Sequence, residues 1–412
     1  MKKPELLVPA SNLEVLKTAV IFGADAVYIG GEAYGLRAKA KNFSMEDMKE
    51  GIAFAHERGV KVYVTANIIA HEEDLSGVEE YFKELKEVKP DALIISDPGV
   101  FTIAKRICPG IDRHISTQAN TTNSMGFNFW YEQGAARVVA AREMSLEELK
   151  AVRRNIPEKA EIEVFIHGAM CISYSGRCLL SSYFTGRSAN MGECTHPCRW
   201  KYSVSEETRP GEYLPVYENE RGTYIFNSKD LCMIEHIPEL IEAGIDSFKI
   251  EGRMKAALYV ATVARTYRKA IDDYLESPEK YKANMPWYKD QIAGCTYRQF
   301  TTGFFFNKTD DSAQIYDSNT YSRGYVYLGI AGKTNAEGLV ESEQRNKFSV
   351  GEEIEIMKPD GANIPVIVKR ITDEDGHDME SAPHARQKIF IDLGTDVNEY
   401  DILRRREDEP NE

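Results

Sequence analysis

Five of the seven cysteines lie in one stretch of the chain, and their thiols could hold a metal. Structural cysteines behave as small buried hydrophobic residues and have no reason to cluster in sequence. The glycines between them allow the backbone to fold tightly around a small object. In a reducing compartment such a group of thiols predicts a metal centre more strongly than a disulfide framework. The five are Cys171, Cys178, Cys194, Cys198 and Cys232.

The spacing of these cysteines bears on which metal they would hold. In chain order the gaps are C-x6-C, C-x15-C, C-x3-C and C-x33-C. A structural zinc site usually has short C-x-x-C-like pairs, and only Cys194 and Cys198 have such spacing. An iron–sulfur cluster is larger and accepts wider spacing. The residues favour iron–sulfur over zinc, and either metal over none, with one cysteine to spare. Cys108 and Cys295 lie elsewhere and are interpreted as structural.

Short apolar runs alternate with helical patterns from residue 5 to about residue 275. Strands this apolar are typical of a parallel sheet that is covered on both faces. Eight strand–helix units predict a (β/α)8 barrel of the TIM type, with the cysteine-rich segment inserted after the seventh strand. An open doubly wound sheet is the alternative, although the chain lacks the Gly-x-Gly-x-x-Gly turn often found in one. The eight runs cover residues 6–8, 26–29, 60–66, 92–95, 114–116, 137–140, 162–166 and 247–250.

Polar and ionisable residues follow these strands, where a TIM barrel carries its active site. They predict a polar pocket with the cysteine-rich loop over its rim. His167 could serve in proton transfer, or it could be a structural histidine bonded to a loop carbonyl. Glu251 and Arg253 could form a simple ion pair, or the arginine could bind a carboxylate or phosphate. The catalytic candidates are Glu32, Glu143, His167 and Glu251, and the candidates for substrate binding are Asn67, Gln118, Arg142 and Arg253.

The charge pattern limits how the chain could bind nucleic acid. A net charge of −14 argues against broad, non-specific binding, which needs a basic surface. Basic residues nevertheless gather in the cysteine-rich loop, at Arg187, Arg199 and Lys201. Trp200 lies among them, so this loop could grip phosphates and stack unpaired bases.

The chain divides into regions of different pattern. Residues 1–275 are the predicted barrel, with the insertion at about 168–233. A connector at 276–319, with Pro278 and Pro286, is expected to be irregular. Short alternating runs at 320–405 predict a small all-β barrel, and 406–412 form a charged tail. No run approaches the roughly 18 apolar residues of a membrane span, and the first apolar run is too short for a signal peptide. We therefore expect a cytoplasmic protein that does not contact a membrane.

One run of residues resembles the signature of the collagenase-like peptidase family U32. That run is Glu163-x-Phe165-x-x-Gly168-Ala-Met-Cys171-x4-Gly176-x-Cys178. The segments 23–31, 56–63, 193–199 and 300–304 are similar to other characteristic stretches of the family, so the resemblance spans nearly the whole chain.

The resemblance implies more than the residues do alone. Family members with an appended β-domain resemble proteins for prephenate-dependent hydroxylation of the tRNA wobble uridine, which gives 5-hydroxyuridine. It implies a tRNA-modifying enzyme with a 4Fe-4S cluster, prephenate as co-substrate, tRNA as partner and a second family member as a possible partner subunit. It implies Cys171, Cys178, Cys194 and Cys232 as cluster ligands, with Cys198 as the contender for the third position. The alternatives are a peptidase, as the family name states, and a zinc-stabilised RNA-binding scaffold.

Overall fold

A computed structural model describes residues 2–31, 42–171, 173–200, 229–295, 299–306 and 324–407. Within the cysteine-rich insertion it also describes two short paired strands, β8 (Glu218–Asn219) and β9 (Gly222–Thr223).

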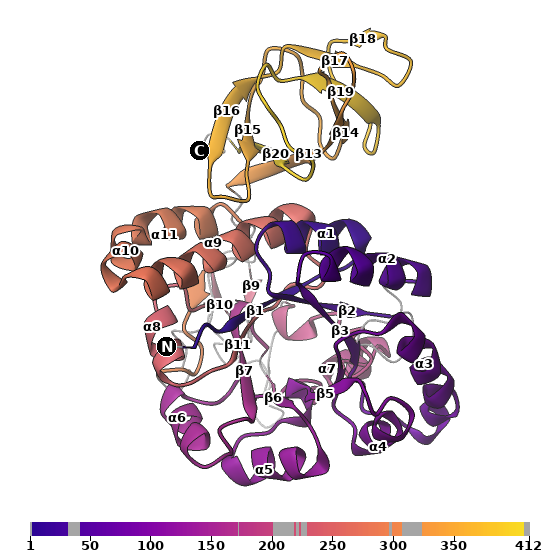
Figure 1. Cartoon of the computed structure of the whole chain (residues 1–412), viewed down its shortest axis with the longest axis vertical. Coiled ribbons are helices and arrows are strands. Elements are labelled where there is room, and N and C mark those ends of the chain that lie inside the picture. Colours follow the sequence, from indigo (N-terminus) through magenta and orange to yellow (C-terminus); the bar gives the residue numbers. More distant parts are fainter. Residues whose placement is uncertain are drawn as a thin grey trace, which may run out of the picture.

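Eight parallel strands close into a barrel, as the strand–helix pattern predicts (Figure 1). Closure comes from β11, which pairs in parallel with β1 on one side and with β7 on the other. Phe248, for example, lies opposite Leu6 in β1 and opposite Val164 in β7. The open-sheet alternative is therefore excluded. The strands are β1 (Glu5–Pro9), β2 (Ala26–Gly30), β3 (Lys61–Ala66), β4 (Ala92–Ile95), β5 (Asp112–Ile115), β6 (Arg137–Val139), β7 (Glu161–Ala169) and β11 (Ser247–Ile250).

Helices form the outer layer, and side-chain caps begin several of them. Ser44 accepts a hydrogen bond from the backbone N–H of Asp47 at 3.1 Å, and Ser145 and Glu148 form a reciprocal capping box. None of the described helices is both long and apolar enough to cross a bilayer. The barrel helices are α1 (Leu13–Ile21), α2 (Met45–His56), α3 (Leu75–Val88), α4 (Pro98–Ile107), α5 (Ser124–Gln133), α6 (Leu146–Arg154), α8 (Ile237–Glu242) and α9 (Ala257–Glu276), with short 3₁₀ turns η1 (Glu72–Asp74) and η2 (Thr117–Ala119).

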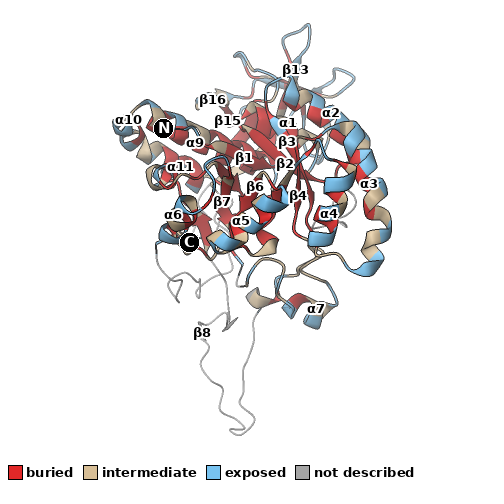
Figure 2. Cartoon of the chain, turned by 60° about the horizontal axis from the view of Figure 1, so that its bottom comes forward, coloured by how far each residue is buried: buried red, intermediate tan, exposed pale blue. Residues whose placement is uncertain are grey.

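The cysteine-rich insertion leaves the barrel at the end of β7 and returns beside it. It contains α7 (Leu180–Thr185) and η3 (Pro197–Arg199), and it ends in β10 (Asp230–Cys232). β10 runs antiparallel to the last three residues of β7, with Cys232 opposite His167. In Figure 2, α7 lies outside the ring of barrel helices. The insertion therefore follows the seventh strand, as predicted.

The connector is more regular than we expected from its prolines. Two helices, α10 (Pro278–Ala283) and α11 (Met285–Ala293), are followed by β12 (Phe300–Thr301), which pairs with β10. Both prolines lie in the first turn of a helix, where a missing N–H costs nothing. The expectation of an irregular segment is wrong for residues 278–293, because these prolines begin helices rather than break them.

The C-terminal region is a separate antiparallel half-barrel, in agreement with the predicted small β-domain (Figure 1). It has its own core, which includes Leu328, Ile356 and Ile391. It docks on α9, where Arg265 donates a hydrogen bond to the carbonyl of Lys358 at 2.8 Å. Its strands are β13 (Tyr325–Thr334), β14 (Val340–Glu343), β15 (Glu353–Met357), β16 (Asn363–Ile367), β17 (Arg370–Thr372), β18 (Asp378–Met379), β19 (Lys388–Asp392) and β20 (Ile402–Arg406).

A buried ion network lies inside the barrel. The Glu163 carboxylate has no exposed surface and accepts hydrogen bonds from Arg137 at 3.0 Å and Lys249 at 2.8 Å. Arg137 also contacts Glu5, which accepts a hydrogen bond from Tyr63 at 2.7 Å. Buried charges are tolerated when they are paired in this way. The network fixes β1, β3, β6, β7 and β11 relative to one another.

Replacing Glu163 with glutamine should destabilise the barrel strongly. The substitution leaves Arg137 and Lys249 without their shared counter-ion, and breaking a buried pair costs about 3–5 kcal/mol. Urea denaturation followed by circular dichroism measures the loss. Glu147→Gln is the control, because Glu147 makes only an exposed pair with Lys150 and should leave the midpoint unchanged. Equal midpoints for the two variants would contradict the assignment.

Candidate metal centre and substrate cavity

A cavity of about 690 Å³ lies between the mouth of the barrel and the cysteine-rich insertion. Its floor consists of residues at the C-terminal ends of the strands, where the sequence predicts a polar pocket. Its other wall comes from the insertion. The floor includes Thr65, Asn67, Gln118, Arg142, Glu143, Lys249, Glu251 and Arg253, and the insertion contributes Cys171, Cys178, Arg187, Cys194 and Cys198.

Four of the five clustered cysteines line this cavity, and none of them is in a disulfide. Gly176, between the first two, has a φ of +73° and Gly192 one of +70°, so glycine allows the tight turns of the loop. The backbone N–H of His196 points at the Cys194 sulfur at 3.4 Å. Several cysteines on a tight loop, with a backbone donor at one sulfur, are a donor set that suits a thiolate-bound metal centre.

Cys232 occupies a different position. Its thiol is not part of the cavity lining, and it lies 3.6 Å from the hydroxyl of Tyr267 on α9. Burial raises the pKa of this thiol. Because β10 pairs with β7, Cys232 lies next to the end of β7, where the loop that carries Cys171 begins. The structure thus brings four thiols to the cavity wall and places the fifth beside the end of β7.

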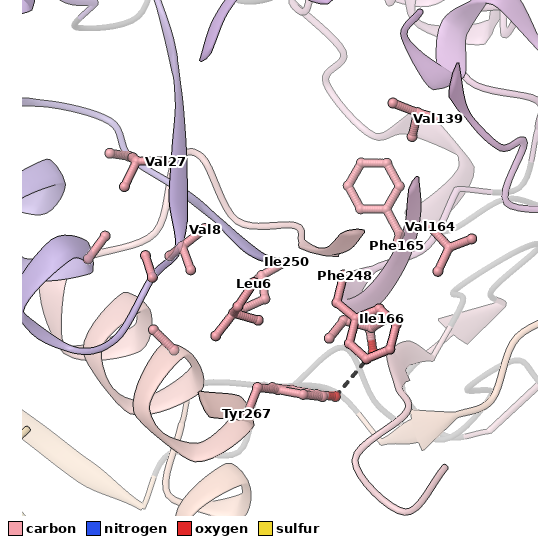
Figure 3. Close-up of a cluster of buried hydrophobic side chains, with 14 of the residues drawn as sticks. Leu6, Val8, Val27, Val139, Val164, Phe165, Ile166, Phe248, Ile250 and Tyr267 are labelled. Atoms are coloured by element: carbon pink, nitrogen blue, oxygen red, sulfur yellow. Dashed lines mark hydrogen bonds between the residues drawn. The ribbon is translucent and has the colours of Figure 1, made fainter. Parts of the chain in front are cut away.

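His167 lies in the aromatic core beneath the cavity, and it does not line the cavity. Its ring packs edge-on against Tyr267 and near Phe300 and Tyr259. Burial, followed by the charge of Lys255, lowers the pKa of His167 to about 3, so the ring is neutral at physiological pH. Figure 3 shows Tyr267 beneath β7, donating a hydrogen bond to the carbonyl of Ile166. This placement favours the structural alternative over the catalytic one.

The carboxylates and arginines predicted from the strand ends meet at the cavity floor. Arg142 donates to Glu251 at 2.9 Å and to the carbonyl of Ala169 at 2.7 Å, and it stacks on the ring of Phe165 at 3.8 Å. Burial raises the pKa of Glu143, although the charge of Arg142 partly opposes this. Among the described acid–base candidates, Glu143 is the carboxylic acid whose pKa the structure raises.

Arg253 and the amide of Asn67 complete the floor. Arg253 is 7% exposed and donates to the hydroxyl of Thr65 at 2.9 Å. It lies so close to Gly30 that a Cβ there would come within 2.6 Å of its guanidinium. Asn67 donates to Ser116 at 3.3 Å. Such a buried guanidinium on a cavity floor is suited to binding a carboxylate.

The sequence analysis missed Lys249 as a cavity residue. Lys249 lies in β11 between Phe248 and Ile250, and its amine reaches Glu163 and the face of Tyr28. The sequence does contain a signal for this position, because Lys249 is the one charged residue in a short apolar strand. Successive side chains of a strand point to opposite faces, so if Phe248 and Ile250 face the outer layer, Lys249 must face the barrel interior.

Some predicted residues cannot be placed. Glu32 and Lys201 lie outside the described residues, as does the side chain of Arg199. Arg187 is exposed and lines the cavity. Beside it on α7, Tyr183 is 83% exposed, and its ring contacts Phe184.

The chain matches the family model of Peptidase family U32 over residues 11–315, and that of the family's C-terminal domain over residues 323–404. The chain belongs to Peptidase family U32. This membership confirms the resemblance found in the sequence.

Three relatives illustrate what this U32 chain is similar to. The tRNA hydroxylation protein P1 of Bacillus subtilis is 40% identical over 405 residues, which are 98% of this chain and 95% of the relative. The tRNA hydroxylation protein P of Escherichia coli is 36% identical, over 98% of this chain and 97% of the relative. A 23S rRNA 5-hydroxycytidine synthase of Escherichia coli is 38% identical, over 86% of this chain and 49% of that protein.

Proposed function

We propose that this U32 protein hydroxylates C5 of the wobble uridine of tRNA, using a 4Fe-4S cluster and prephenate. The observation that carries the proposal is that thiols and cationic side chains line one cavity at the barrel mouth. Hydroxylation replaces C5–H by C5–OH, with loss of the C5 proton, so it needs an oxygen donor that also accepts two electrons. The names of the relatives, two for tRNA hydroxylation and one for a hydroxycytidine synthase, support RNA as the substrate.

The thiol arrangement supports an iron–sulfur cluster over a single zinc ion. Zinc at about 2.3 Å from each sulfur would hold its thiolates less than about 4 Å apart. Among the described residues, no three of the cysteine sulfurs lie within 4.8 Å of one another. A cluster spreads its four thiolates more widely. Cys171, Cys178 and Cys194 would hold it with Cys232, or with Cys198 in place of one of them. When bound, such a cluster supplies one-electron transfer.

The cationic floor supports a small dicarboxylic acid as co-substrate. Arg253 and Lys249 are both buried, and Arg142, which is paired with Glu251, lines the same cavity. Because guanidinium groups pair with carboxylates through two parallel hydrogen bonds, two arginines on one floor suit two carboxylates. Prephenate is such an acid. Glu143, with its raised pKa, lies where it could exchange a proton with a bound substrate.

The rim of the cavity supports binding of unpaired nucleotides. Tyr183, Phe184 and Trp200 form a chain of ring contacts with centroid separations of 5.1 and 6.0 Å. All three are exposed, and Arg187, which follows α7 by two residues, lines the cavity. Exposed aromatic rings beside a cation can stack the bases of a single-stranded loop and contact its phosphates.

Tyr183→Ala should weaken tRNA binding about tenfold, since stacking of one base contributes about 1–3 kcal/mol. Filter binding at several salt concentrations measures this change. Arg187→Ala should also make the salt dependence shallower, by about one unit of slope. Phe129→Ala is the control, because Phe129 is a half-exposed ring on α5 with no part in the rim. Equal losses of tRNA affinity for Tyr183→Ala and Phe129→Ala would show that the aromatic rings of α7 are not part of the RNA-binding surface.

The proposed reaction can be tested with the purified protein. The anaerobically loaded protein is incubated with tRNA that lacks the modification, with and without prephenate, and the nucleosides are analysed by mass spectrometry. We expect 5-hydroxyuridine only when both the cluster and prephenate are present. Cleavage of a collagen peptide by the same preparation, with no change in the tRNA, would support the peptidase alternative instead.

A further inference from the structure

The side chain of Gln118 is a buried amide on the cavity floor. It lies in η2, directly after β5, and is 1% exposed. Its two polar atoms, Nε2 and Oε1, make no hydrogen bond to the part of the chain that the structure describes. Leaving one buried polar atom unpaired costs about 1–3 kcal/mol. Such an amide is well suited to recognise a ligand that enters the cavity.

The backbone around Gln118 holds this amide in one place. Its N–H donates to Ser116 Oγ at 3.3 Å, and its carbonyl accepts from Asn120 at 2.6 Å. Gly176 of the cysteine loop lies against it from the other side, where a Cβ would come within 2.4 Å of Nε2. The amide is therefore clamped between the barrel and the loop that joins Cys171 to Cys178.

We infer that Gln118 pairs with the Watson–Crick edge of a pyrimidine base that has turned out of its strand into the cavity. This inference rests on the proposed function and adds a residue that selects the base. A primary amide presents one donor and one acceptor side by side. Uracil presents a complementary pair, the O4 acceptor beside the N3–H donor, so both atoms of Gln118 are satisfied at once. A carboxylate only accepts, and would leave Oε1 unpaired.

The geometry of the cavity fits this role. A base must leave its stack to reach a floor that lies beneath a loop, as in other enzymes that modify bases. The amide contacts the loop of the proposed cluster, so the pairing would hold the base between the cationic floor and the thiols. In the orientation that suits uracil, Nε2 donates to O4 and Oε1 accepts from N3–H. The C5 chemistry of the proposed function, rather than this amide, limits the base to a pyrimidine.

Binding of an anticodon stem–loop tests the inference without depending on catalysis. The full-length loaded protein is titrated with a stem–loop that has either uridine or 3-methyluridine at the wobble position, without prephenate. The methyl group removes the N3–H donor. We expect the wild type to prefer uridine about tenfold, and Gln118→Met to bind both with equal, weakened affinity. Gln133→Met is the control, because Gln133 is an exposed residue at the end of α5, and it should keep the preference.

Other outcomes of this experiment overturn the inference. A wild type that binds the two stem–loops equally, or a Gln118→Met variant that still discriminates, removes Gln118 as the base reader. Weaker prephenate binding by Gln118→Met, measured by calorimetry with base preference retained, would assign the amide to the acid instead. Gln118→Leu removes both the donor and the acceptor from a side chain of similar size, so it should also lose the preference if Gln118→Met proves unstable. If the preference is present but no 5-hydroxyuridine forms, the proposed function fails while this inference stands.

Discussion

Replacing Arg253 with methionine should lower prephenate-dependent hydroxylation at least a hundredfold while leaving the fold intact. Arg253 is buried on the cavity floor, where its guanidinium donates a hydrogen bond to the Thr65 hydroxyl at 2.9 Å. Removing a guanidinium that pairs with a buried carboxylate costs about 2–5 kcal/mol. The apparent affinity for prephenate, from 5-hydroxyuridine yield against acid concentration, measures the effect.

Two further variants test whether the loss of activity comes from the buried guanidinium of Arg253. Arg154→Met removes an exposed arginine from the last turn of α6 and should change neither yield nor acid dependence. Arg253→Lys should recover only part of the activity, because an ammonium does not reproduce the bidentate pairing of a guanidinium. Wild-type acid dependence in Arg253→Met would show that the acid binds elsewhere.

Replacing Cys178 with alanine should remove nearly all of the protein-bound iron. Cys178 lies on the cavity wall with three other cysteines, and losing one of four ligands should also loosen the loop, because cluster binding and loop folding are coupled. Iron and labile sulfide are measured in anaerobic preparations. Cys171→Ala, Cys194→Ala and Cys232→Ala should behave alike, and Cys198→Ala should be milder. Cys108→Ala is the control, because that thiol is buried at the end of α4, next to the Phe82 carbonyl.

Separate replacement of Cys198 and Cys232 distinguishes the two possible sets of cluster ligands. Family resemblance favours Cys232, and its position opposite His167 keeps it at the root of the loop. The cavity lining includes Cys198. Full iron in Cys232→Ala with loss in Cys198→Ala would assign the four cavity thiols as ligands.

The barrel could be predicted from sequence because its signals are local. Most of the barrel strands contain an apolar run, and residues such as Ser44 mark where helices begin. The connector could not be predicted, because Pro278 and Pro286 signal a loop and a helix start equally well. Only packing against α9 and the following strand distinguishes the two.

The site could be predicted in part. Strand ends identify Arg142, Glu143 and Arg253, because barrel topology brings those ends together. Sequence could not decide the role of His167, since a strand residue near the mouth can face the cavity or the outer layer. Nor could it reveal that Gln118 has an unpaired amide, which depends on Gly176 approaching from a distant loop.

The central claim is that a thiol-held cluster over a cationic cavity serves tRNA hydroxylation. The most direct test is nucleoside mass spectrometry of tRNA from a deletion strain without a paralogue, complemented with the wild type, Cys178→Ala or Cys108→Ala. The account predicts that 5-hydroxyuridine derivatives disappear on deletion and return with the wild type and Cys108→Ala, but not with Cys178→Ala. Unchanged 5-hydroxyuridine in the deletion strain, or full restoration by Cys178→Ala, would contradict it.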